Sequence, residues 1–295
     1  MIDSKLTTFI NVAKLKSYTK TAEYLNLTQP AVTQHIKQLE DYYGVKLINK
    51  KGRQIYLTEE GQILLKYDKE LEAGSLALER DLKNKSSVTK RYNIGATLTI
   101  GEFVLPDSLG EYKKLHDNID IIMNVNNLEE VLKRLKSGEI DLGIVEGPFD
   151  KSKFICRKYK DDELMLAAAP SSSIAKGPAV KIEDIIGSGR LILREKGSGT
   201  RKTFENKLSE LGFNIADIKI YMEIGNLGAI KSLVEADLGI TVISREAMKK
   251  EVMGNTLKEI PVSGVKFIRE FNFVYLEHSP SEFIEDFTAF LSQKK

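Results

Sequence analysis

Hydrophobic side chains recur at helical spacing through the first 43 residues of the chain and predict three helices. The first helix, over residues 4–16, is marked by four apolar positions: Leu6, Phe9, Ile10 and Ala13. A short helix over residues 20–25 and a longer one over residues 28–43 follow, with a tight turn at residues 26–28 between them. We expect the first helix to pack its apolar face under the other two.

The longest of these segments carries signals for its start, its end and its buried face. Thr28 is suited to cap the N-terminus, and Pro30 falls in the first turn, where a missing N–H costs nothing. Gly44 stands in a C-cap position. The buried face is formed by three residues at i, i+4 and i+7, which are Val32, Ile36 and Leu39.

A polar face lies on the other side of this helix. Gln29, Thr33 and Lys37 stand at i, i+4 and i+8, with Gln34 beside them. Gln can pair bidentately with adenine, Thr can meet a polar base edge or a thymine methyl, and Lys can reach guanine or phosphate. We interpret the pair of helices as a helix-turn-helix with residues 28–43 as the recognition helix. Taken alone, the segment also fits an ordinary helical bundle with a solvated face.

A hairpin with a basic tip is predicted directly after this helix. Its strands cover residues 45–49 and 54–57, and its tip is Lys50, Lys51, Gly52 and Arg53. Beside a helix-turn-helix, such a wing lies along phosphates or reaches into the minor groove. A solvated turn is the alternative, and the position after the recognition helix favours the wing.

A long helix is predicted from Thr58, its cap, to about residue 85, with Glu59 and Glu60 at its positive end. Apolar positions alternate in steps of three and four at Leu64, Tyr67, Leu71, Gly74 and Leu78. This is the pattern of a short coiled-coil seam, weakened at the glycine, and we interpret it as a dimerisation arm. The polar residues 84–91 are expected to form a hinge.

Short apolar strands alternate with helical patterns from residue 92 onward. The predicted strands are 92–96, 119–125, 140–145, 154–159, 164–169, 191–193, 218–224, 240–243 and 271–276. The predicted helices are 101–114, 128–136, 200–211, 227–236 and 281–291. This alternation predicts an α/β fold with parallel sheets covered by helices, arranged as two lobes with a return to the first.

Charge is unevenly distributed along the 295 residues, although the net charge is only +2. Residues 1–58 hold eight Lys and one Arg against two Asp and two Glu, a net of +5, so the remainder carries −3. A basic head on a slightly acidic body fits a first domain that meets phosphate. No apolar run approaches a membrane span, and no signal segment opens the sequence, so we expect a cytoplasmic protein that does not bind membranes.

Several classes of chemistry find no support in the residue pattern. Cys156 is the single cysteine, and the three histidines, His35, His116 and His278, are far apart, so no metal site or cofactor is predicted. The segment GSGTRKT lacks the ending of a Walker A loop. No catalytic triad or paired-carboxylate arrangement can be argued from spacing, and we predict that the chain is not an enzyme.

The whole chain resembles the LysR-type transcriptional regulators. The residues that carry the resemblance are AEYLNLTQPAVTQHIKQLE, the hairpin ending in YLTEEG, and the order of winged helix-turn-helix, linker helix and two-lobed ligand domain. The sequence REKGSGTR is similar to the branch with CysL- and CbbR-like regulators of sulfite reduction and carbon fixation. One departure is that Leu47 is followed by Ile48-Asn49-Lys50, where the family commonly has Phe-x-Arg, so the forked arginine contact is lost.

The resemblance implies a domain plan and partners. We expect a winged helix-turn-helix over 1–58, a linker and dimerisation helix with hinge over 59–88, and an effector domain over 89–295 with a periplasmic-binding-protein-like fold. Lobe I would cover about 89–160 and 267–295, and lobe II about 161–266. The implied partners are double-stranded DNA, a small-molecule effector, and further copies of the chain in a homodimer or homotetramer. The candidate DNA-binding residues are Thr19, Gln29, Pro30, Ala31, Thr33, Gln34, Lys37, Lys50, Lys51 and Arg53.

Three strand-to-helix turns rich in small polar residues suggest where the effector binds, because ligands of α/β folds lie beyond strand ends near helix N-termini. In the family that the chain resembles, the positions that match Thr97, Thr99, Ser198 and Thr200 often contact the effector. The candidate effector-binding residues are Thr97, Leu98, Thr99, Ile100, Glu146, Ser198, Gly199, Thr200, Arg201 and Asn226. Glu146 either lines the cleft or belongs to the hinge, and Arg201 either supplies a positive charge or pairs with Glu205 at i+4.

The predicted effector is a small anion, because helix N-termini carry unpaired N–H groups and partial positive charge. A glutamate facing the cleft disfavours a highly charged anion, which leaves a monoanion or a zwitterion. Tight turns without a ligand remain the alternative for each single loop. For the chain as a whole, the second hypothesis is a substrate-binding protein or α/β enzyme with an incidental helical N-terminus.

Overall fold

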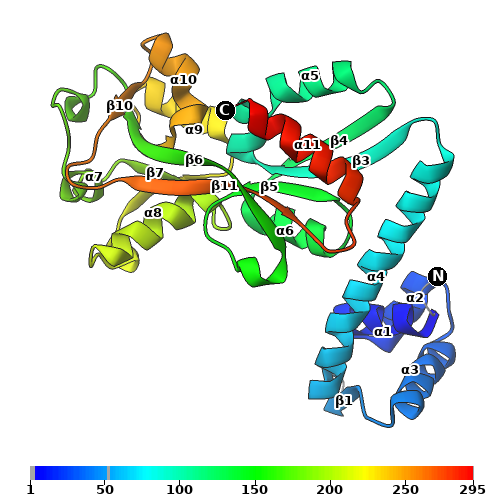
Figure 1. Cartoon of the computed structure of the whole chain (residues 1–295). Helices are drawn as coiled ribbons and strands as arrows, with labels where there is room; N and C mark the ends of the chain where they lie inside the picture. The colour runs from blue at the N-terminus through cyan, green and yellow to red at the C-terminus, as the bar shows by residue number, and fades with distance from the viewer. Residues whose placement is uncertain (1–3, 52–53, 295) are drawn as a thin grey trace. The chain divides into compact units, whose positions relative to one another are not determined.

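The computed structural model describes residues 4–51 and 54–294. The chain divides into two compact units, residues 1–83 with 136–139, and residues 84–135 with 140–295. The first unit holds the predicted helix-turn-helix and hairpin, and the second holds the α/β fold (Figure 1). None of the described helices combines the length and the apolar character that crossing a membrane requires.

Three helices open the first unit, α1 (Ser4–Leu15), α2 (Tyr18–Leu25) and α3 (Gln29–Tyr43). The Thr28 side chain accepts a hydrogen bond from the N–H of Ala31, and Gly44 ends α3 with φ near +70°, as the sequence predicts. The buried face of α3 packs against α1 in a core that includes Phe9, Val12 and Ile36. The polar face of α3 is therefore left to solvent.

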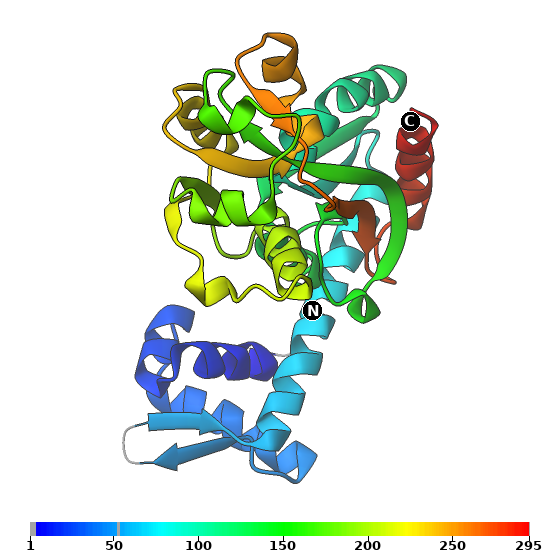
Figure 2. The ribbon, with the colours of Figure 1, turned by 90° about the vertical axis from the view of Figure 1, so that its left-hand side faces the viewer.

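The hairpin that follows pairs β1 (Ile48–Lys51) with β2 (Gln54–Leu57) in antiparallel register (Figure 2). The predicted first strand, 45–49, is shifted, because β1 begins at Ile48 and includes Lys50 and Lys51, which the sequence pattern places in the tip. At the start of β1 the backbone donors bond to a side chain from α3. Glu40 accepts hydrogen bonds from the N–H groups of Leu47 at 3.0 Å and Ile48 at 3.3 Å, and from Lys46 Nζ at 2.6 Å. This carboxylate ties the hairpin to α3.

A single helix, α4 (Glu59–Ser86), leaves the hairpin, and Thr58 caps it by accepting the N–H of Gly61 at 2.9 Å. Because α4 continues through Ser86 and β3 starts at Lys90, the predicted hinge over 84–91 shrinks to residues 87–89. Asn84 holds this short connection, since its side chain accepts from the N–H of Arg91 at 2.9 Å and donates to the carbonyl of Arg91 at 3.0 Å.

The described part of the second unit is built on one mixed sheet of nine strands. Parallel strands form each end, with β4 (Ile119–Asn126), β3 (Lys90–Thr97) and β5 (Leu142–Glu146) at one and β9 (Ile240–Ser244), β7 (Leu191–Arg194) and β8 (Ile220–Ile224) at the other. Two long antiparallel strands, β6 (Ile155–Ala168) and β11 (Phe267–Tyr275), join the ends (Figure 1), and β10 (Lys258–Ile260) pairs with β6.

The joining strands correct the sequence prediction of purely parallel sheets. The predicted strands 154–159 and 164–169 merge into one strand, β6, which runs from Ile155 to Ala168, and β11 begins four residues before the predicted 271. Charged residues in the middle of both strands hide their continuity from a hydrophobic pattern. The predicted helix over 101–114 is also divided, into a π-helix η1 (Ile100–Val104) and α5 (Pro106–Leu115), since proline begins a helix more readily than it continues one.

The other elements cover the two faces of the sheet. The α-helices are α6 (Leu128–Lys136), α7 (Ile182–Gly187), α8 (Gly199–Glu210), α9 (Leu227–Glu235), α10 (Arg245–Met253) and α11 (Ser281–Gln293). Short 3-10 turns are η2 (Lys151–Lys153), η3 (Ser173–Ala175) and η4 (Ile215–Asp217). The sequence pattern does not predict α7, α10, β10 or the three 3-10 turns. Separate cores lie at each end of the sheet, around Tyr112 and Phe287 at one and around Phe204 and Leu208 at the other.

The helices α1 to α3 and the hairpin β1–β2 form the head of the chain. We expect Glu40→Gln to lower the free energy of unfolding of this head by about 1–3 kcal/mol at neutral pH, because the substitution weakens charged hydrogen bonds to buried backbone donors. Burial alone would raise the pKa of Glu40, but the bonds from Lys46, Leu47 and Ile48 outweigh it and hold the pKa below its ordinary 4.5. The ionised carboxylate therefore stabilises the head fully above its ordinary pKa of 4.5. This stabilisation is lost as the pH falls through the lower pKa that Glu40 has in the folded chain.

Amide hydrogen exchange at Leu47 and Ile48 measures this effect locally. The native chain should lose protection at these amides in acid, whereas Glu40→Gln should be less protected at neutral pH and show a weaker acid response. Asp41→Asn removes the neighbouring exposed carboxylate and serves as the control. Equal protection in native and Glu40→Gln chains would refute the role of this side chain.

Candidate functional site

The polar face of α3 presents most of the candidate DNA-binding residues to solvent. Gln29, Pro30, Thr33, Gln34 and Lys37 are exposed, and Ala31 is half-buried at the edge of this face. Thr19, in the first turn of α2, is exposed as well. The spacing of one helical turn therefore places a row of amide, hydroxyl and ammonium groups on the exposed face of α3.

Two contacts set the geometry around this face. The Thr33 hydroxyl donates to the carbonyl of Gln29 at 3.0 Å, which fixes its rotamer against the first turn of α3. Lys50 Nζ, on β1, lies 4.3 Å from the centroid of the Tyr18 ring at the start of α2. Arg53 lies outside the described residues, and for Lys51 the structure describes the backbone as part of β1.

The candidate effector residues of the first lobe stand where β3 ends. Thr97 is the last residue of the strand, and Thr99 precedes the π-helix η1, a rare form that is frequent at functional sites. Thr97, Thr99 and Ile100 are buried, and the half-buried Leu98 packs with Phe103 against the second lobe. The turn therefore lies at the contact between the lobes rather than on the surface.

The second lobe contributes the N-terminus of α8. Ser198 caps this helix by accepting the N–H of Arg201 at 3.5 Å, and Thr200 is buried beside it. Gly199 packs directly on Glu146 and Gly147, so closely that a Cβ at Gly199 would overlap the carbonyl oxygen of Glu146. Only glycine allows the two lobes to meet here.

Arg269 occupies the centre of this contact. Its guanidinium donates to Asp162 Oδ2 at 2.7 Å and to the Thr200 hydroxyl at 2.8 Å. It also reaches the Thr99 hydroxyl at 3.4 Å, and Nη1 lies 3.6 Å from Glu146 Oε1. The side chains of Arg269, Glu146 and Asp162 are all at least 98% buried, so these three charged groups share a buried space between the lobes.

The sheet register explains why these groups meet. Arg269 on β11 is directly opposite Asp162 on β6, and Glu146 on β5 is opposite Phe271, two residues further along β11. Residues two apart on a strand share a face, so all three charged side chains project to the same side. Glu146, predicted either to line the cleft or to belong to the hinge, is buried and faces the contact between the lobes.

Two buried polar atoms of this cluster have no hydrogen-bond partner among the described residues, namely Thr97 Oγ1 and Glu146 Oε2. Burial raises the pKa of Glu146 above its ordinary value, and the nearby Asp162 adds to this. Arg269, Arg194 and the Thr99 hydroxyl act in the opposite direction without reversing it. The cluster can therefore accept a proton or a hydrogen-bond donor at Glu146.

The remaining candidates are placed differently. Arg201 pairs with Glu205 at 2.7 Å, as one of the two sequence predictions has it, and also contacts Glu223 and the carbonyl of Arg194. It is therefore committed within its own lobe and is not the cation of the cluster. Asn226 is exposed and caps α9 by accepting the N–H of Ala229 at 2.8 Å, so its side chain is engaged with its own helix.

Arg269 and Asp162 are the residues that sequence reasoning missed. In the segment from Phe267 to Tyr275, alternate residues are Phe, Arg, Phe, then a register shift, and the arginine stands at an inward position among phenylalanines. A charged residue on the buried face of a strand is the signal that could have found it. Because the predicted strand began at residue 271, this position was not considered.

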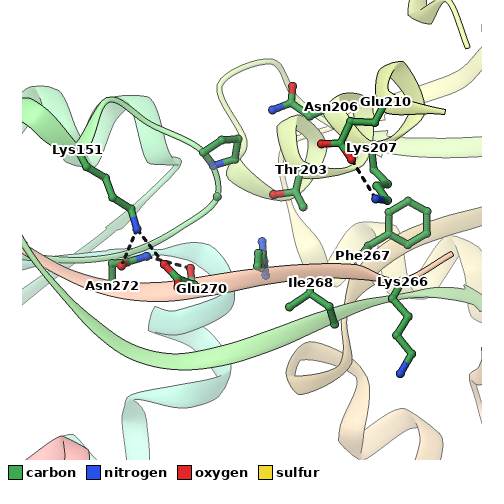
Figure 3. A pocket seen from close by; sticks show the side chains of 13 residues that line it. Lys151, Thr203, Asn206, Lys207, Glu210, Lys266, Phe267, Ile268, Glu270 and Asn272 are labelled. Carbon is green, nitrogen blue, oxygen red and sulfur yellow. Dashed lines mark hydrogen bonds and ion pairs between the residues drawn. The ribbon is translucent and has the colours of Figure 1, made fainter. Parts of the chain in front are cut away.

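A cavity of about 530 Å³ lies next to the cluster, between α8 and β11. Arg269 and Gly147 are among the residues that line it, together with the polar side chains shown in Figure 3. In that view Lys151 points towards Asn272 and Glu270, and Lys207 towards Glu210, with Nζ-to-carboxylate distances of 2.8 Å for Lys151–Glu270 and 2.9 Å for Lys207–Glu210. The described residues contain no group of His, Cys, Asp and Glu that could hold a metal ion.

Comparison with known proteins covers both units. Residues 4–62 match the family described as "Bacterial regulatory helix-turn-helix protein, lysR family", and residues 85–295 match the "LysR substrate binding domain". The chain is 32% identical over 267 residues to the transcriptional activator CmpR of Synechocystis, covering 90% of this chain and 86% of CmpR. It is 29% identical over 280 residues to the regulator CysL of Bacillus subtilis, covering 93% and 90%.

A solved structure shares the fold of the second unit. The regulatory domain of Synechocystis CcmR, in complex with 2-PG, superposes with a TM-score of 0.60 at 23% identity, covering 68% of this chain and 96% of that one. The two family matches together span residues 4–295 except for residues 63–84 within α4, and the relatives include CysL, a regulator of the branch that the sequence resembles. The chain therefore belongs to the LysR family of helix-turn-helix transcriptional regulators.

Proposed function

We propose that this DNA-binding regulator reads base pairs with the exposed face of α3, joins a second copy through α4, and responds to a small anion bound between its lobes. The observation that carries the proposal is the row of exposed polar side chains on α3, a helix capped by Thr28 and Gly44 and packed on α1. A helix of this diameter fits the major groove. The proposed domain limits are those expected from the sequence, 1–58, 59–88 and 89–295.

The proposed division of labour on DNA follows from chemistry. The amide and hydroxyl groups of Gln29 and Thr33 can distinguish base edges, whereas the ammonium group of Lys50 on the hairpin suits phosphate. The structure supports this division because all three side chains are exposed and come from elements tied together by Glu40. Because the proposed role is to bind DNA, we assign the chain to the cytoplasm, and we propose no catalytic role.

We expect Gln29→Ala and Thr33→Ala to cost about 1–3 kcal/mol on the preferred site and to relax discrimination at particular base pairs. Lys50→Ala should weaken binding to all sequences alike and lower the salt slope by about one unit. Gel shifts over a salt series, with promoter DNA and with scrambled DNA, measure both effects. A change of base preference in Lys50→Ala alone would reverse the assignment.

The proposed dimer contact is an exposed apolar stripe on α4. Tyr67, Leu71 and Leu78 are 56%, 60% and 58% exposed, whereas Leu64 packs into the core of the head. A seam of this kind is stable only when another helix covers it. Two half-sites at fixed spacing require two recognition helices held together, which a second copy of α4 provides. In the proposed tetramer, effector domains of neighbouring copies also associate.

We expect Leu71→Glu to weaken the dimer and to reduce DNA affinity by more than tenfold, because the mutation buries an unpaired carboxylate at the helix contact. Gln62→Glu adds the same charge at an exposed position of α4 outside the stripe and serves as the control. Sedimentation velocity measures the assembly and a gel shift measures DNA binding. An unchanged oligomer in Leu71→Glu would remove α4 as the dimer contact.

The proposed effector is a small monoanion or zwitterion. The N-terminus of α8, the hydroxyls of Thr97, Thr99 and Thr200, and the Arg269 guanidinium offer donors at one contact between the lobes. Glu146 in the same place disfavours a highly charged ligand. The related fold of the CcmR regulatory domain in complex with 2-PG supports a small-molecule effector. Ligand binding would change the lobe contact and thereby the spacing of the DNA-binding heads.

We expect Ser198→Asp to abolish the effector response, because a carboxylate at the start of α8 would occupy the position proposed for the anion. DNA binding without effector is the control measurement and should match the native chain. A metabolite screen by thermal shift identifies the effector, and a gel shift with and without it gives the response. A normal response in Ser198→Asp, or a cationic effector, would refute the anion site and leave the regulator assignment intact.

A further inference from the structure

We propose that the Glu146 carboxylate is an internal competitor of the effector, so that an anion binds the Arg269 guanidinium only as Glu146 gives it up or takes a proton. This inference rests on the proposed function, because it concerns the same site between the lobes. It adds the residue that holds the anion, the residue that limits its affinity, and a dependence of the response on pH.

The distances within the cluster separate a firm partner of Arg269 from a loose one. Asp162 accepts from Nε at 2.7 Å and is itself held by the Ser244 hydroxyl at 2.7 Å. Glu146 lies 3.6 Å from Nη1, beyond hydrogen-bond distance. The Asp162 pair is thus a fixed structural contact, and Glu146 is the carboxylate that a ligand can replace.

Two unpartnered atoms mark the space next to Glu146 as incomplete. Thr97 and Glu146 are about 98% buried, and Thr97 Oγ1 and Glu146 Oε2 lack hydrogen-bond partners in the described part of the chain. An unsatisfied carboxylate oxygen in a dry site is unfavourable, and it can be satisfied by a proton or by a hydroxyl or ammonium group of a ligand. A monoanion that also carries a hydrogen-bond donor, such as a hydroxy acid, satisfies Arg269 and Glu146 together.

The charges around Glu146 make the competition sensitive to pH. It faces Arg269 on β11, Asp162 on β6 and Arg194 on β7, with the hydroxyls of Thr97 and Thr99 at the end of β3. Burial, which outweighs the two arginines, raises the pKa of its carboxyl group. Below that pKa the group is neutral and no longer competes for Arg269, so anion affinity should rise as pH falls.

A cavity adjoins the cluster at Arg269, whose side chain is itself 2% exposed. Arg269 and Gly147 are among its lining residues, and three lysines, Lys151, Lys207 and Lys266, stand around it (Figure 3). Lys151 and Lys207 are paired with Glu270 and Glu210, so the rim is close to neutral. The cavity admits a ligand of a few heavy atoms without itself selecting for high charge.

The test uses the full-length chain and three probes, acetate, glycolate and methanesulfonate, each titrated to tens of millimolar in a thermal unfolding assay. Glu146→Gln keeps the size and removes the charge, and we expect it to bind at least one probe about tenfold or more tightly than the native chain does. Glu270→Gln removes a carboxylate from the cavity rim without touching Arg269 and should bind like the native chain. Arg269→Gln should bind none of the probes.

The pH series uses methanesulfonate, which stays ionised throughout. Its affinity for the native chain should rise by up to about tenfold for each unit of falling pH, whereas Glu146→Gln should give a flat profile. If Arg269→Gln does not fold, as judged by circular dichroism, the comparison of Glu146→Gln with Glu270→Gln decides.

The inference is overturned if no probe stabilises Glu146→Gln, if Glu146→Gln and Glu270→Gln gain affinity equally, or if a folded Arg269→Gln binds anions normally. These outcomes are separable from failure of the proposed function. Promoter binding by the native chain tests the regulator, and loss of the effector response in Ser198→Asp tests the effector site. Both can hold while the competition between Glu146 and the anion is absent.

Discussion

One guanidinium group holds the two lobes of the effector domain in register. Arg269 comes from a strand shared by both ends of the sheet, and its donors reach the Thr99 turn of the first lobe and the Thr200 turn of the second. Buried charge is tolerated only with partners, and Glu146 has a loose contact with Arg269 at 3.6 Å and an oxygen without a hydrogen-bond partner among the described residues. This carboxylate can be satisfied by a proton or by a hydrogen-bond donor.

The geometry of the contact depends on a small residue as much as on charge. Gly199 lets the N-terminus of α8 approach the Glu146–Gly147 backbone, and a side chain there would force the lobes apart. The N–H groups at the start of α8 and the hydroxyl of Thr200 consequently lie within reach of groups on the other lobe. The same two strands, β6 and β11, run through both lobes and pair with each other across the contact, with one register shift between Phe271 and Asn272.

A second buried carboxylate performs a comparable task in the head. Glu40 leaves the core side of α3 and accepts the backbone donors of Leu47 and Ile48, so the hairpin keeps a fixed position relative to the recognition helix. The two sites differ in how completely the carboxylate oxygens are hydrogen-bonded. The hydrogen bonds of Glu40 lower its pKa and stabilise the charged form, whereas Glu146 has an oxygen without a partner and a raised pKa. The first arrangement is suited to rigidity and the second to response.

The sequence by itself determined the features that depend on local spacing. The apolar positions of α3, its caps at Thr28 and Gly44, the hairpin beside it and the alternation of strands and helices can be read from the order of residues, because helix and strand periods are short-range properties. The family resemblance follows from the same local motifs. The Thr97, Thr99, Ser198 and Thr200 turns could likewise be proposed, because each stands between a strand and a helix.

Only the tertiary structure decided which charges meet. Glu146 and Asp162 lie on consecutive strands, whereas Arg269 follows Asp162 by 107 positions, and their encounter depends on the register of β11 with β5 and β6. Strand register is a non-local property, since shifting a strand by one residue sends each side chain to the other face. Arg201, which its place near the α8 N-terminus favoured, is held by Glu205 and Glu223. The cation of the cluster is instead Arg269, which lies 69 positions after Thr200 in the chain and reaches it only in the folded structure.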